Sequence, residues 1–268
     1  MTVSIILTSY NYGKYLKDTI TSVVAQTYRD WELVIIDDCS DDNSFDIIME
    51  FANSDSRIRV IKNHINQGLA KSLQTALLAV AGEWVVFLES DDLLKGDYLE
   101  KKLKVAEEYP SVGLIYNNVE FFGDDSLVAE KKFSSLITKN KKLHFPRNMF
   151  YKLGYENLIL TMSSVMVKRR YLDELDFETP IDKLLDWYLY IQLARKTDFY
   201  YLDEKLTLWR QHSDSYLNKD RKIKFRFANI EAYLLVLKRE PWNLKLVLYI
   251  IFSTFLMCMK RLSVYLSK

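Results

Sequence analysis

The first hundred residues alternate between two hydrophobic periodicities, and this alternation restricts the fold more than any other feature of the sequence. Short apolar runs rich in β-branched residues predict strands that are buried on both faces. Between them, apolar residues recur at the spacing of an amphipathic helix. The predicted strands are 3–7, 33–36, 58–61 and 84–88, and the predicted helices lie around 16–24, 47–51 and 69–80. Strands that alternate with helices imply right-handed crossovers, so we predict an α/β fold with a mostly parallel central sheet flanked by helices.

From about residue 112 the pattern changes to mixed strands and helices. Runs at 112–116, 119–122, 163–167 and 205–210 predict strands, and an amphipathic helix is expected near 183–195. Residues 124–126 predict a turn, and 139–142 a solvated loop or a helix start. We interpret this part as the mixed half of one continuous sheet. Beyond residue 215 the chain is predicted to be helical, with a break at Pro241.

Charge is distributed unevenly along a chain whose formal net charge is only +1. Residues 219–268 carry 11 basic and 3 acidic side chains, whereas the other 218 residues carry 26 and 33. An acidic body argues against a nucleic-acid-binding protein, because such proteins present a basic binding face. The basic tail instead predicts contact with an anionic surface.

The tail also contains an uncharged stretch of 14 residues, 246–259, bounded by Lys245 and Lys260. A helix needs about 20 apolar residues to cross a bilayer, so this stretch is too short. Its basic and aromatic flanks favour an in-plane anchor on an anionic leaflet, through residues 219–268. The alternative is a core or dimer helix that covers one flank of the sheet.

Cysteine content and the amino-terminal sequence bear on the compartment. Two cysteines, Cys39 and Cys258, are too few for a disulfide framework. The opening residues lack the pattern of a secretory signal. We therefore expect a cytoplasmic protein, peripheral at the inner face of the cell membrane.

Polar clusters follow three of the predicted strands, at 8–11, 37–40 and 89–92. In parallel sheets ligands bind at the carboxyl ends of the strands, so these clusters should share one edge. Several carboxylates at one edge repel one another unless a cation lies between them, and oxygen ligands favour Mg²⁺ or Mn²⁺. Such ions usually complete their shells with substrate phosphate, which predicts a nucleotide or diphosphate ligand.

Five stretches resemble glycosyltransferase family 2, inverting enzymes of the GT-A fold that use a nucleotide-sugar donor. They are VSIILTSYN at 3–11, VIIDDCSDD at 34–42, NQG at 66–68, AGEWVVFLESDD at 81–92 and LDWYLYIQLA at 185–194. The resemblance covers about residues 1–215. It implies a metal-dependent transfer of sugar, with UDP the commonest nucleotide, to a hydroxyl of a glycan or lipid-linked acceptor in cell-surface polysaccharide synthesis.

The resemblance also divides the chain and assigns roles to residues. It implies a nucleotide-sugar-binding half at 1–110 and an acceptor and catalytic-base half at 111–215, and the remaining residues, 216–268, form the helical extension predicted from the tail sequence. The implied donor-binding residues are Thr8, Tyr10, Asp37, Asp38, Asn66, Gly68, Lys71, Glu89 and Ser90. Tyr10 and one of the two aspartates would contact the nucleoside, and Asn66, Gly68 and Lys71 the diphosphate. The implied metal ligands are Asp91, Asp92 and His212, for Mn²⁺ or Mg²⁺, and Asp186 is the implied catalytic base.

Asp186 precedes Trp187, whose bulk is expected to raise the pKa of that carboxyl by removing water from it. Two positions depart from the family pattern. Glu89 stands where the metal motif usually has aspartate, and Leu73-Gln74 replaces a common Arg-Asn pair.

Structural readings compete with these roles, and two other functions stay open. Asp38, Asp91 and Asp92 also suit helix caps, Tyr10 a sheet-edge position, Asp186 a solvated helix position and His212 a structural role. Glu89 leaves open a non-catalytic nucleotide-sugar-binding protein or partner subunit. A sugar-nucleotide pyrophosphorylase is the other alternative, although residues 10–13 hold one glycine where such enzymes have a glycine-rich loop.

Overall fold

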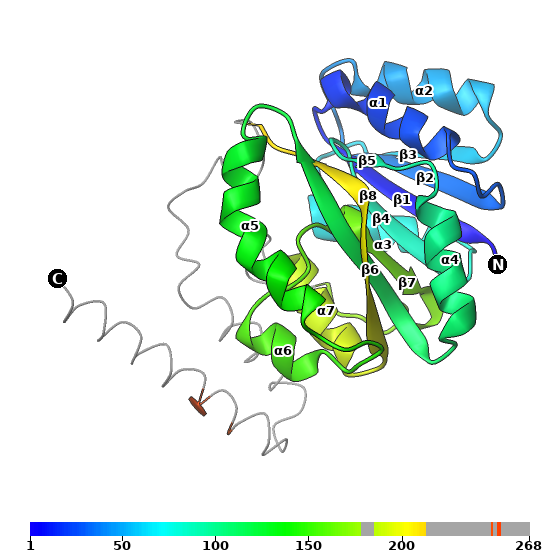
Figure 1. Ribbon diagram of the computed structural model, residues 1–268. Coiled ribbons are helices and arrows are strands. Elements are labelled where there is room, and N and C mark those ends of the chain that lie inside the picture. Colours follow the sequence, from blue (N-terminus) through cyan, green and yellow to red (C-terminus); the bar gives the residue numbers. More distant parts are fainter. Residues whose placement is uncertain (178–184, 213–247, 249–250, 253–268) are drawn as a thin grey trace.

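Every strand predicted in the first hundred residues forms, one to three residues longer than its apolar run. Residues 1–177, 185–212, 248 and 251–252 are described in the computed structural model of the chain (Figure 1). The strands are β1 (Val3–Ser9), β2 (Trp31–Asp37), β3 (Ile58–Lys62), β4 (Trp84–Glu89), β5 (Leu93–Leu94), β6 (Val112–Phe122), β7 (Val165–Lys168) and β8 (Asp198–Arg210). They form one sheet in the order β3-β2-β1-β4-β7-β6-β8-β5.

The sheet has a parallel half and a mixed half, as the sequence predicts. β3, β2, β1 and β4 run parallel. β7 is antiparallel to both β4 and β6, and it joins the two halves. β6 and β8 then run parallel, and β5 pairs antiparallel with β8.

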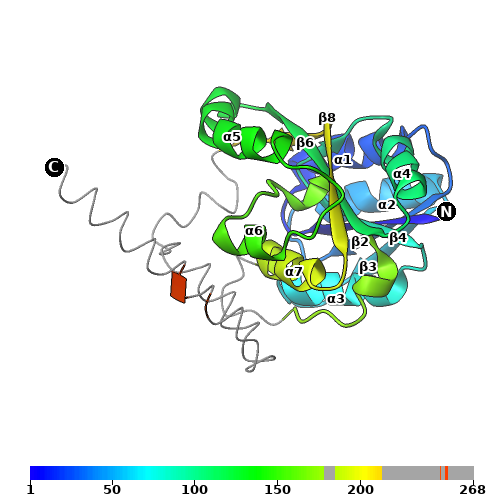
Figure 2. The ribbon, with the colours of Figure 1, turned by 60° about the horizontal axis from the view of Figure 1, so that its bottom comes forward.

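Helices cover both faces of the sheet (Figures 1 and 2). The helices are α1 (Gly13–Val24), α2 (Ser44–Ser54), α3 (Leu69–Ala79), α4 (Tyr98–Glu108), α5 (Ser126–Lys141), α6 (Phe150–Tyr155) and α7 (Leu185–Ala194), with short 3-10 turns at η1 (Met162–Ser164) and η2 (Arg169–Tyr171). One hydrophobic cluster joins α1, α2 and α4 to the sheet, and the other joins α3, α6 and α7 to it. Along β1 the side chains alternate between the two clusters, which explains its unbroken apolar run.

β6 corrects the prediction of two strands at 112–116 and 119–122. The strand is continuous, and its pairing with β8 shifts register around Asn117 and Asn118. Asn117 Nδ2 donates to the backbone oxygen of Asn118 at 2.6 Å, and Asn118 Oδ1 accepts from the backbone N–H of Val119 at 2.9 Å. These side chains satisfy backbone groups at the irregularity, so two polar residues bend the strand without ending it.

α5 is a 16-residue helix that the sequence pattern did not predict. Residues 139–142, expected to be a loop or a helix start, lie at its end instead. Only Ala129 and Asn140 of this helix are buried. A helix with so little buried surface has no apolar stripe, and hydrophobic periodicity therefore cannot reveal it.

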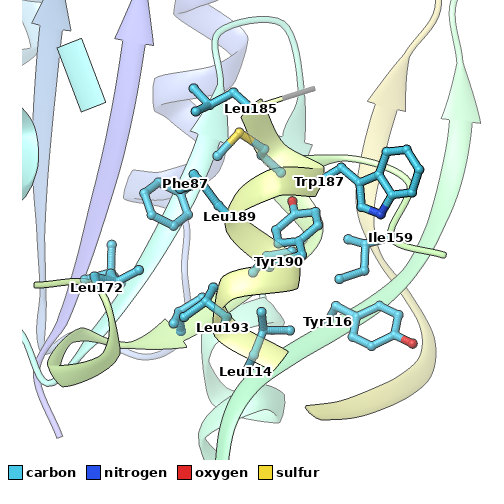
Figure 3. Packing of buried hydrophobic residues seen from close by; sticks show 14 of the residues in the cluster. Phe87, Leu114, Tyr116, Ile159, Leu172, Leu185, Trp187, Leu189, Tyr190 and Leu193 are labelled. Atoms are coloured by element: carbon cyan, nitrogen blue, oxygen red, sulfur yellow. The ribbon is translucent and has the colours of Figure 1, made fainter. Parts of the chain in front are cut away.

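α7 confirms the helix expected near 183–195, but it is not amphipathic. Every residue of α7 except Asp186 is buried. Figure 3 shows the helix surrounded by apolar side chains, with Phe87 and Leu114 among them. Asp186 is thus the one acidic group on a helix otherwise enclosed in the core.

Most of the tail lies outside the described residues, including the predicted break at Pro241 and most of the predicted in-plane anchor. Leu248, Ile251 and Phe252 are described, are helical, and are between 57% and 61% exposed. Within the described part of the chain, no helix combines the length and the apolar character that crossing a bilayer requires.

Candidate functional site

The carboxyl ends of β1, β2 and β4 lie together at one edge of the sheet. In the pairing register Ser9 lies opposite Asp37, and Thr8 lies opposite Glu89. Ser90 Oγ donates to the backbone oxygen of Thr8 at 3.0 Å, which ties the loop after β4 to β1. The three polar clusters therefore converge, as predicted from the parallel topology.

Tyr10 and Asp37 are placed differently at this edge. Tyr10 follows β1 and is 45% exposed, so its ring is open to a stacking partner. Asp37 is fully buried. One of its carboxylate oxygens accepts from the backbone N–H of Ser40 at 3.3 Å, and the other has no hydrogen-bond partner within the described residues. Asp37 thus keeps a spare acceptor.

Asp38 has a structural task that distinguishes it from Asp37. Its carboxylate accepts from the backbone N–H groups of Gln67 and Gly68, at 2.9 and 2.8 Å, and from Asn63 Nδ2 at 2.7 Å. These bonds fix the loop that leads into α3. Of the two aspartates considered for the nucleoside, Asp37 therefore has the free oxygen and Asp38 shapes the neighbouring loop.

The residues predicted for the diphosphate surround the amino end of α3. Gly68 precedes the helix with φ of +81°, a conformation that favours glycine. Asn66, Gly68 and Lys71 are all exposed there. A helix amino terminus presents free N–H groups and a positive dipole to an anion. Leu73, one of the two departures on α3, is buried in the core, whereas Gln74 is exposed.

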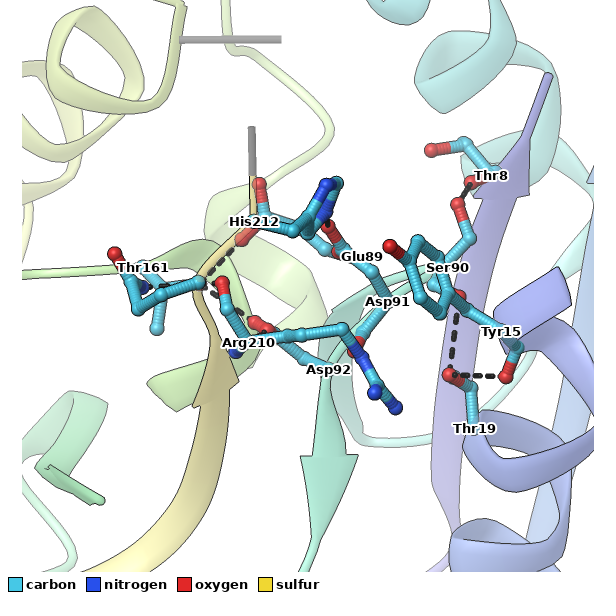
Figure 4. Close-up of polar contacts among 11 residues, drawn as sticks. Thr8, Tyr15, Thr19, Glu89, Ser90, Asp91, Asp92, Thr161, Arg210 and His212 are labelled. Carbon is cyan, nitrogen blue, oxygen red and sulfur yellow. Dashed lines mark hydrogen bonds and ion pairs between the residues drawn. The ribbon is translucent and has the colours of Figure 1, made fainter. Parts of the chain in front are cut away.

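Thr161 links two of the carboxylates after β4 (Figure 4). Its hydroxyl lies within hydrogen-bond distance of Glu89 Oε2, and it lies 3.1 Å from Asp92 Oδ2. The other oxygen of Asp92 accepts from the backbone N–H of Arg210 at 3.0 Å. Asp92 is fully buried with both oxygens bonded. Its role as a metal ligand stays a prediction, and the structure gives it an anchoring role.

Crowding changes the proton affinity of these acids. Glu89 keeps an exposed surface, but the protein around its carboxyl displaces water, which together with the charge of Asp91 raises the pKa of Glu89 to about 7. Burial, followed by the charges of Asp91 and Glu89, raises the pKa of Asp92 well above its usual range. A bound cation relieves repulsion of this kind.

Asp91, in the loop after β4, contacts His212, which follows the end of β8. His212 Nε2 lies 2.9 Å from Asp91 Oδ2, and the imidazole is nearly buried against the ring of Tyr15 on α1, with ring centroids 4.9 Å apart. Arg210 Nε donates to the backbone oxygen of Asp91 at 2.8 Å. The end of β8 therefore holds Asp91 through both Arg210 and His212.

A divalent ion fits the donor set of Asp91 and His212. His212 Nε2 and Asp91 Oδ2 contact each other directly at 2.9 Å, and two adjacent ligands of an octahedral ion, each about 2.1 Å from it, are also about 3 Å apart. The described residues contain no cluster of three or more histidine, cysteine or acidic side chains suited to a metal. Mg²⁺-type sites often have only one or two protein ligands, because substrate phosphate and water supply the rest.

Asp186 is the second residue of α7 and lies in its first turn. Burial raises the pKa of its carboxyl to about 6, and the backbone N–H of Trp187 and Asn157 Nδ2, 3.5 Å away, partly offset this effect. The expected direction of the shift and its origin in burial are therefore confirmed, and the contribution of the Trp187 side chain to that burial stays a prediction. The indole of Trp187 donates to the backbone oxygen of Leu153 on α6 at 2.7 Å. The charge of Asp186 also acts on Glu89, which places the two carboxylates in one electrostatic cluster.

Three residues of the site were not assigned from the sequence: Thr161, Arg210 and Tyr15. Arg210 lies two residues before His212, which the resemblance had singled out, so this segment of the sequence could have indicated Arg210 as well. Thr161 carries no local signal, because it meets Glu89 and Asp92 only through a contact 69 to 72 residues away in sequence.

The chain matches known proteins over most of its length. The sequence profile described as Glycosyl transferase family 2 matches residues 4–176. A Bacillus subtilis protein that carries the name of a teichuronic acid biosynthesis glycosyltransferase, TuaG, is 34% identical over 62% of this chain and 62% of its own length. The Escherichia coli UDP-Glc:alpha-D-GlcNAc-diphosphoundecaprenol beta-1,3-glucosyltransferase WfgD is 32% identical over 72% of this chain and 70% of its own.

Among solved structures, the mannosyltransferase PcManGT from Pyrobaculum calidifontis, in complex with GDP-Man and Mn²⁺, has a similar fold. The TM-score is 0.66 at 18% identity, and the match covers 88% of this chain and 64% of PcManGT. The chain thus spans about two thirds of the length of these proteins. The profile covers more than half of the chain, and the polar edge has the arrangement expected from the motifs. The chain therefore belongs to glycosyltransferase family 2 and has the GT-A fold.

Proposed function

We propose that the protein is a metal-dependent inverting glycosyltransferase. It transfers sugar from a nucleotide-sugar, with UDP as the nucleotide, to a hydroxyl of a glycan or lipid-linked acceptor in cell-surface polysaccharide synthesis. One observation carries this proposal: the polar ends of β1, β2 and β4 converge beside an Asp91–His212 pair, and the charge of the half-buried Asp186 acts on Glu89 at the same edge. The name of WfgD, which specifies a UDP-sugar and a diphosphoundecaprenol-linked acceptor, supports the choice of substrates.

Donor binding uses three features of the edge. The exposed ring of Tyr10 stacks on the base, and the unpartnered oxygen of Asp37 accepts a hydrogen bond from the nucleoside. The amino end of α3, with Gly68 and Lys71, faces the diphosphate. Because Asp38 fixes this loop through three hydrogen bonds, the site is formed before the donor arrives.

Asp91 and His212 would hold Mn²⁺ or Mg²⁺. When bound, the ion neutralises the charge that develops on the departing nucleoside diphosphate. Arg210 and the ring of Tyr15 keep Asp91 and His212 in place, and Thr161 with Asp92 secures the loop behind them. The chain's contribution here is therefore a fixed pair of ligands.

Asp186 acts as the base that removes the proton of the acceptor hydroxyl. A carboxyl with a pKa of about 6 is ionised at neutral pH, yet it binds a proton more strongly than an ordinary aspartate. Its place at the start of an otherwise buried helix fixes its position. The acceptor approaches from the side of α6 and α7.

Membrane contact through residues 219–268 completes the proposal. The tail is basic, and Leu248, Ile251 and Phe252 present exposed apolar side chains at positions i, i+3 and i+4, which share one helix face. Such a face suits the inner leaflet, where a lipid-linked acceptor is reached from the cytoplasm.

Release of UDP from a panel of UDP-sugars, measured with Mn²⁺ and with EDTA, tests the activity. We expect slow hydrolysis of one donor in Mn²⁺ and faster turnover when a lipid-linked sugar is added. Binding of a donor without any hydrolysis or transfer would instead identify a non-catalytic nucleotide-sugar-binding protein.

A further inference from the structure

Lys102 on α4 is fully buried, and no carboxylate pairs with it among the described residues. Its Nζ lies 2.5 Å from the backbone oxygen of Ser164, 2.9 Å from the hydroxyl oxygen of Tyr98 and 3.3 Å from the backbone oxygen of Ile115. Three acceptors thus surround Nζ, as many as a lysine can donate to, although burial lowers the pKa of Lys102 well below its usual range. The surroundings of Lys102 are therefore built for a fully bonded lysine and not for an apolar side chain.

Tyr98 extends this network by one step. Its hydroxyl accepts from Lys102 and donates to the backbone oxygen of Ser163 at 3.0 Å. Both side chains come from the first two turns of α4, and both act on the short turn η1. Two hydrogen bonds from α4 thus fix two successive carbonyl groups, those of Ser163 and Ser164.

The same turn holds the acidic loop from its other side. Ser163 Oγ accepts from the backbone N–H of Glu89 at 3.0 Å. Thr161, directly before the turn, bonds Glu89 and Asp92 through its hydroxyl. A continuous chain of hydrogen bonds therefore runs from Lys102 through η1 to the loop that carries Asp91.

We propose that Lys102 and Tyr98 are positioning residues for the acidic loop, and that they set its affinity for metal and nucleotide. This inference rests on the proposed function. The physical reason is that the carbonyl groups of Ser163 and Ser164 accept from α4, and that of Ser163 also accepts from Thr207 Oγ1 at 3.2 Å. The α4 donors therefore contribute to where η1 and Thr161 lie, beside the hydrogen bonds within the turn. Partners outside the ligands of a metal typically change its affinity by about 10- to 100-fold when removed.

A purely stabilising role makes a different prediction. Replacing a buried charge by an apolar side chain of similar size is often neutral or stabilising, whereas a buried amide with unmet hydrogen bonds is destabilising. Lys102→Met should therefore fold at least as stably as Lys102→Gln. Glutamine, however, still donates a hydrogen bond and preserves the turn better. If Lys102 positions the loop, the affinity for Mn²⁺ and UDP should fall in the order wild type, Lys102→Gln, Lys102→Met. The melting temperatures should not follow this order, because Lys102→Met is expected to be at least as stable as Lys102→Gln.

The experiment compares wild type, Lys102→Met, Lys102→Gln and the control Lys101→Met. Lys101 neighbours Lys102 on α4 but forms exposed ion pairs with Asp97 and Glu204. We would measure melting temperature, the Mn²⁺ concentration at half-saturation, and Kd for UDP in saturating Mn²⁺. We expect about tenfold weaker Mn²⁺ and UDP binding for Lys102→Met, an intermediate value for Lys102→Gln and no change for the control.

Unchanged binding in Lys102→Met, or affinities that follow the melting temperatures, would overturn the proposal. If Lys102→Met does not fold, Tyr98→Phe decides, because it retains the ring and the lysine and removes only the hydroxyl, with its bonds to Ser163 and Lys102. Amide hydrogen exchange of Glu89 provides a test independent of activity, since its N–H donates to Ser163 Oγ. Faster exchange is expected in the Lys102 variants, and an unchanged rate refutes the positioning role even if wild type fails to bind UDP.

Discussion

Replacing Asp186 with Asn separates the activity of the site from its stability. The side chain is isosteric and cannot accept the proton of an acceptor hydroxyl. A general base contributes about 10²- to 10⁴-fold, so transfer should fall by that factor. Donor binding should be almost unchanged, because Asp186 belongs to α7 and not to the loops that carry Tyr10, Asp37 and Gly68.

The stability of the same variant should rise at neutral pH. Burial raises the pKa of Asp186 from 3.8 to about 6, so the folded protein disfavours the ionised carboxyl by up to about 3 kcal/mol, less a discount for its partial exposure. The native state binds this proton more tightly than the unfolded state. The penalty is therefore fully present above pH 6 and is lost as the pH falls from 6 toward 4.

Denaturant unfolding and transfer rates of wild type and Asp186→Asn, at pH 7.5 and pH 5, would measure both effects. We expect the variant to be more stable at pH 7.5, with the difference shrinking by about 1.4 kcal/mol per pH unit below 6. The wild-type rate should fall about tenfold per pH unit below 6 for the same reason. A variant that is less stable at pH 7.5, or that loses donor binding, would refute the assignment of a buried base.

Three other changes test the remaining parts of the site. Asp91→Asn should weaken UDP binding in Mn²⁺ by tenfold or more and leave any binding in EDTA unchanged, as calorimetry would show. Thr161→Val should lower transfer by about tenfold while the fold persists by circular dichroism, because it removes the hydroxyl that joins Glu89 to Asp92. Gly68→Ala should destabilise the protein by about 1 kcal/mol and weaken donor binding. An alanine at φ of +81° is strained, although its Cβ would meet no atom within 4 Å. A donor affinity equal to that of wild type would contradict the role given to this loop.

The parallel half of the fold was predictable because β1, β2 and β4 are buried on both faces and its helices on one, which gives unbroken apolar runs and helical apolar periods in the sequence. β3, at the edge of the sheet, is only partly buried and was predicted from its β-branched residues. α5 escaped because it buries almost nothing, and α7 was misread as amphipathic because it buries almost everything. In neither case does the helix have one apolar and one polar face, because α5 is mostly exposed and α7 is mostly buried. Hydrophobic periodicity therefore could not reveal the environment of either helix.

The candidate site likewise has a part that was predictable from the sequence and a part that was not. Asp37, Glu89 and Asp91 were found because they follow strands whose ends had to converge. The separation of tasks between Asp37 and Asp38 depends on the loop at 63–68, which no local pattern reveals. Thr161 contacts the acidic loop although more than 60 residues of sequence separate them. Lys102 contacts the turn η1, which is also more than 60 residues away, and η1 in turn contacts the acidic loop. Their roles appear only when the chain is folded.

Calorimetric binding of UDP, GDP and dTDP, with Mn²⁺ and then with EDTA, tests the central claim most directly. Among the residues that the structure describes, the proposed site has only Asp91 and His212 as protein ligands, so nucleotide and metal should bind together. We predict that UDP binds in Mn²⁺ and that EDTA removes most of this binding. Equal binding in EDTA, or no binding of any of the three nucleotides, would contradict a metal-dependent nucleotide-sugar site.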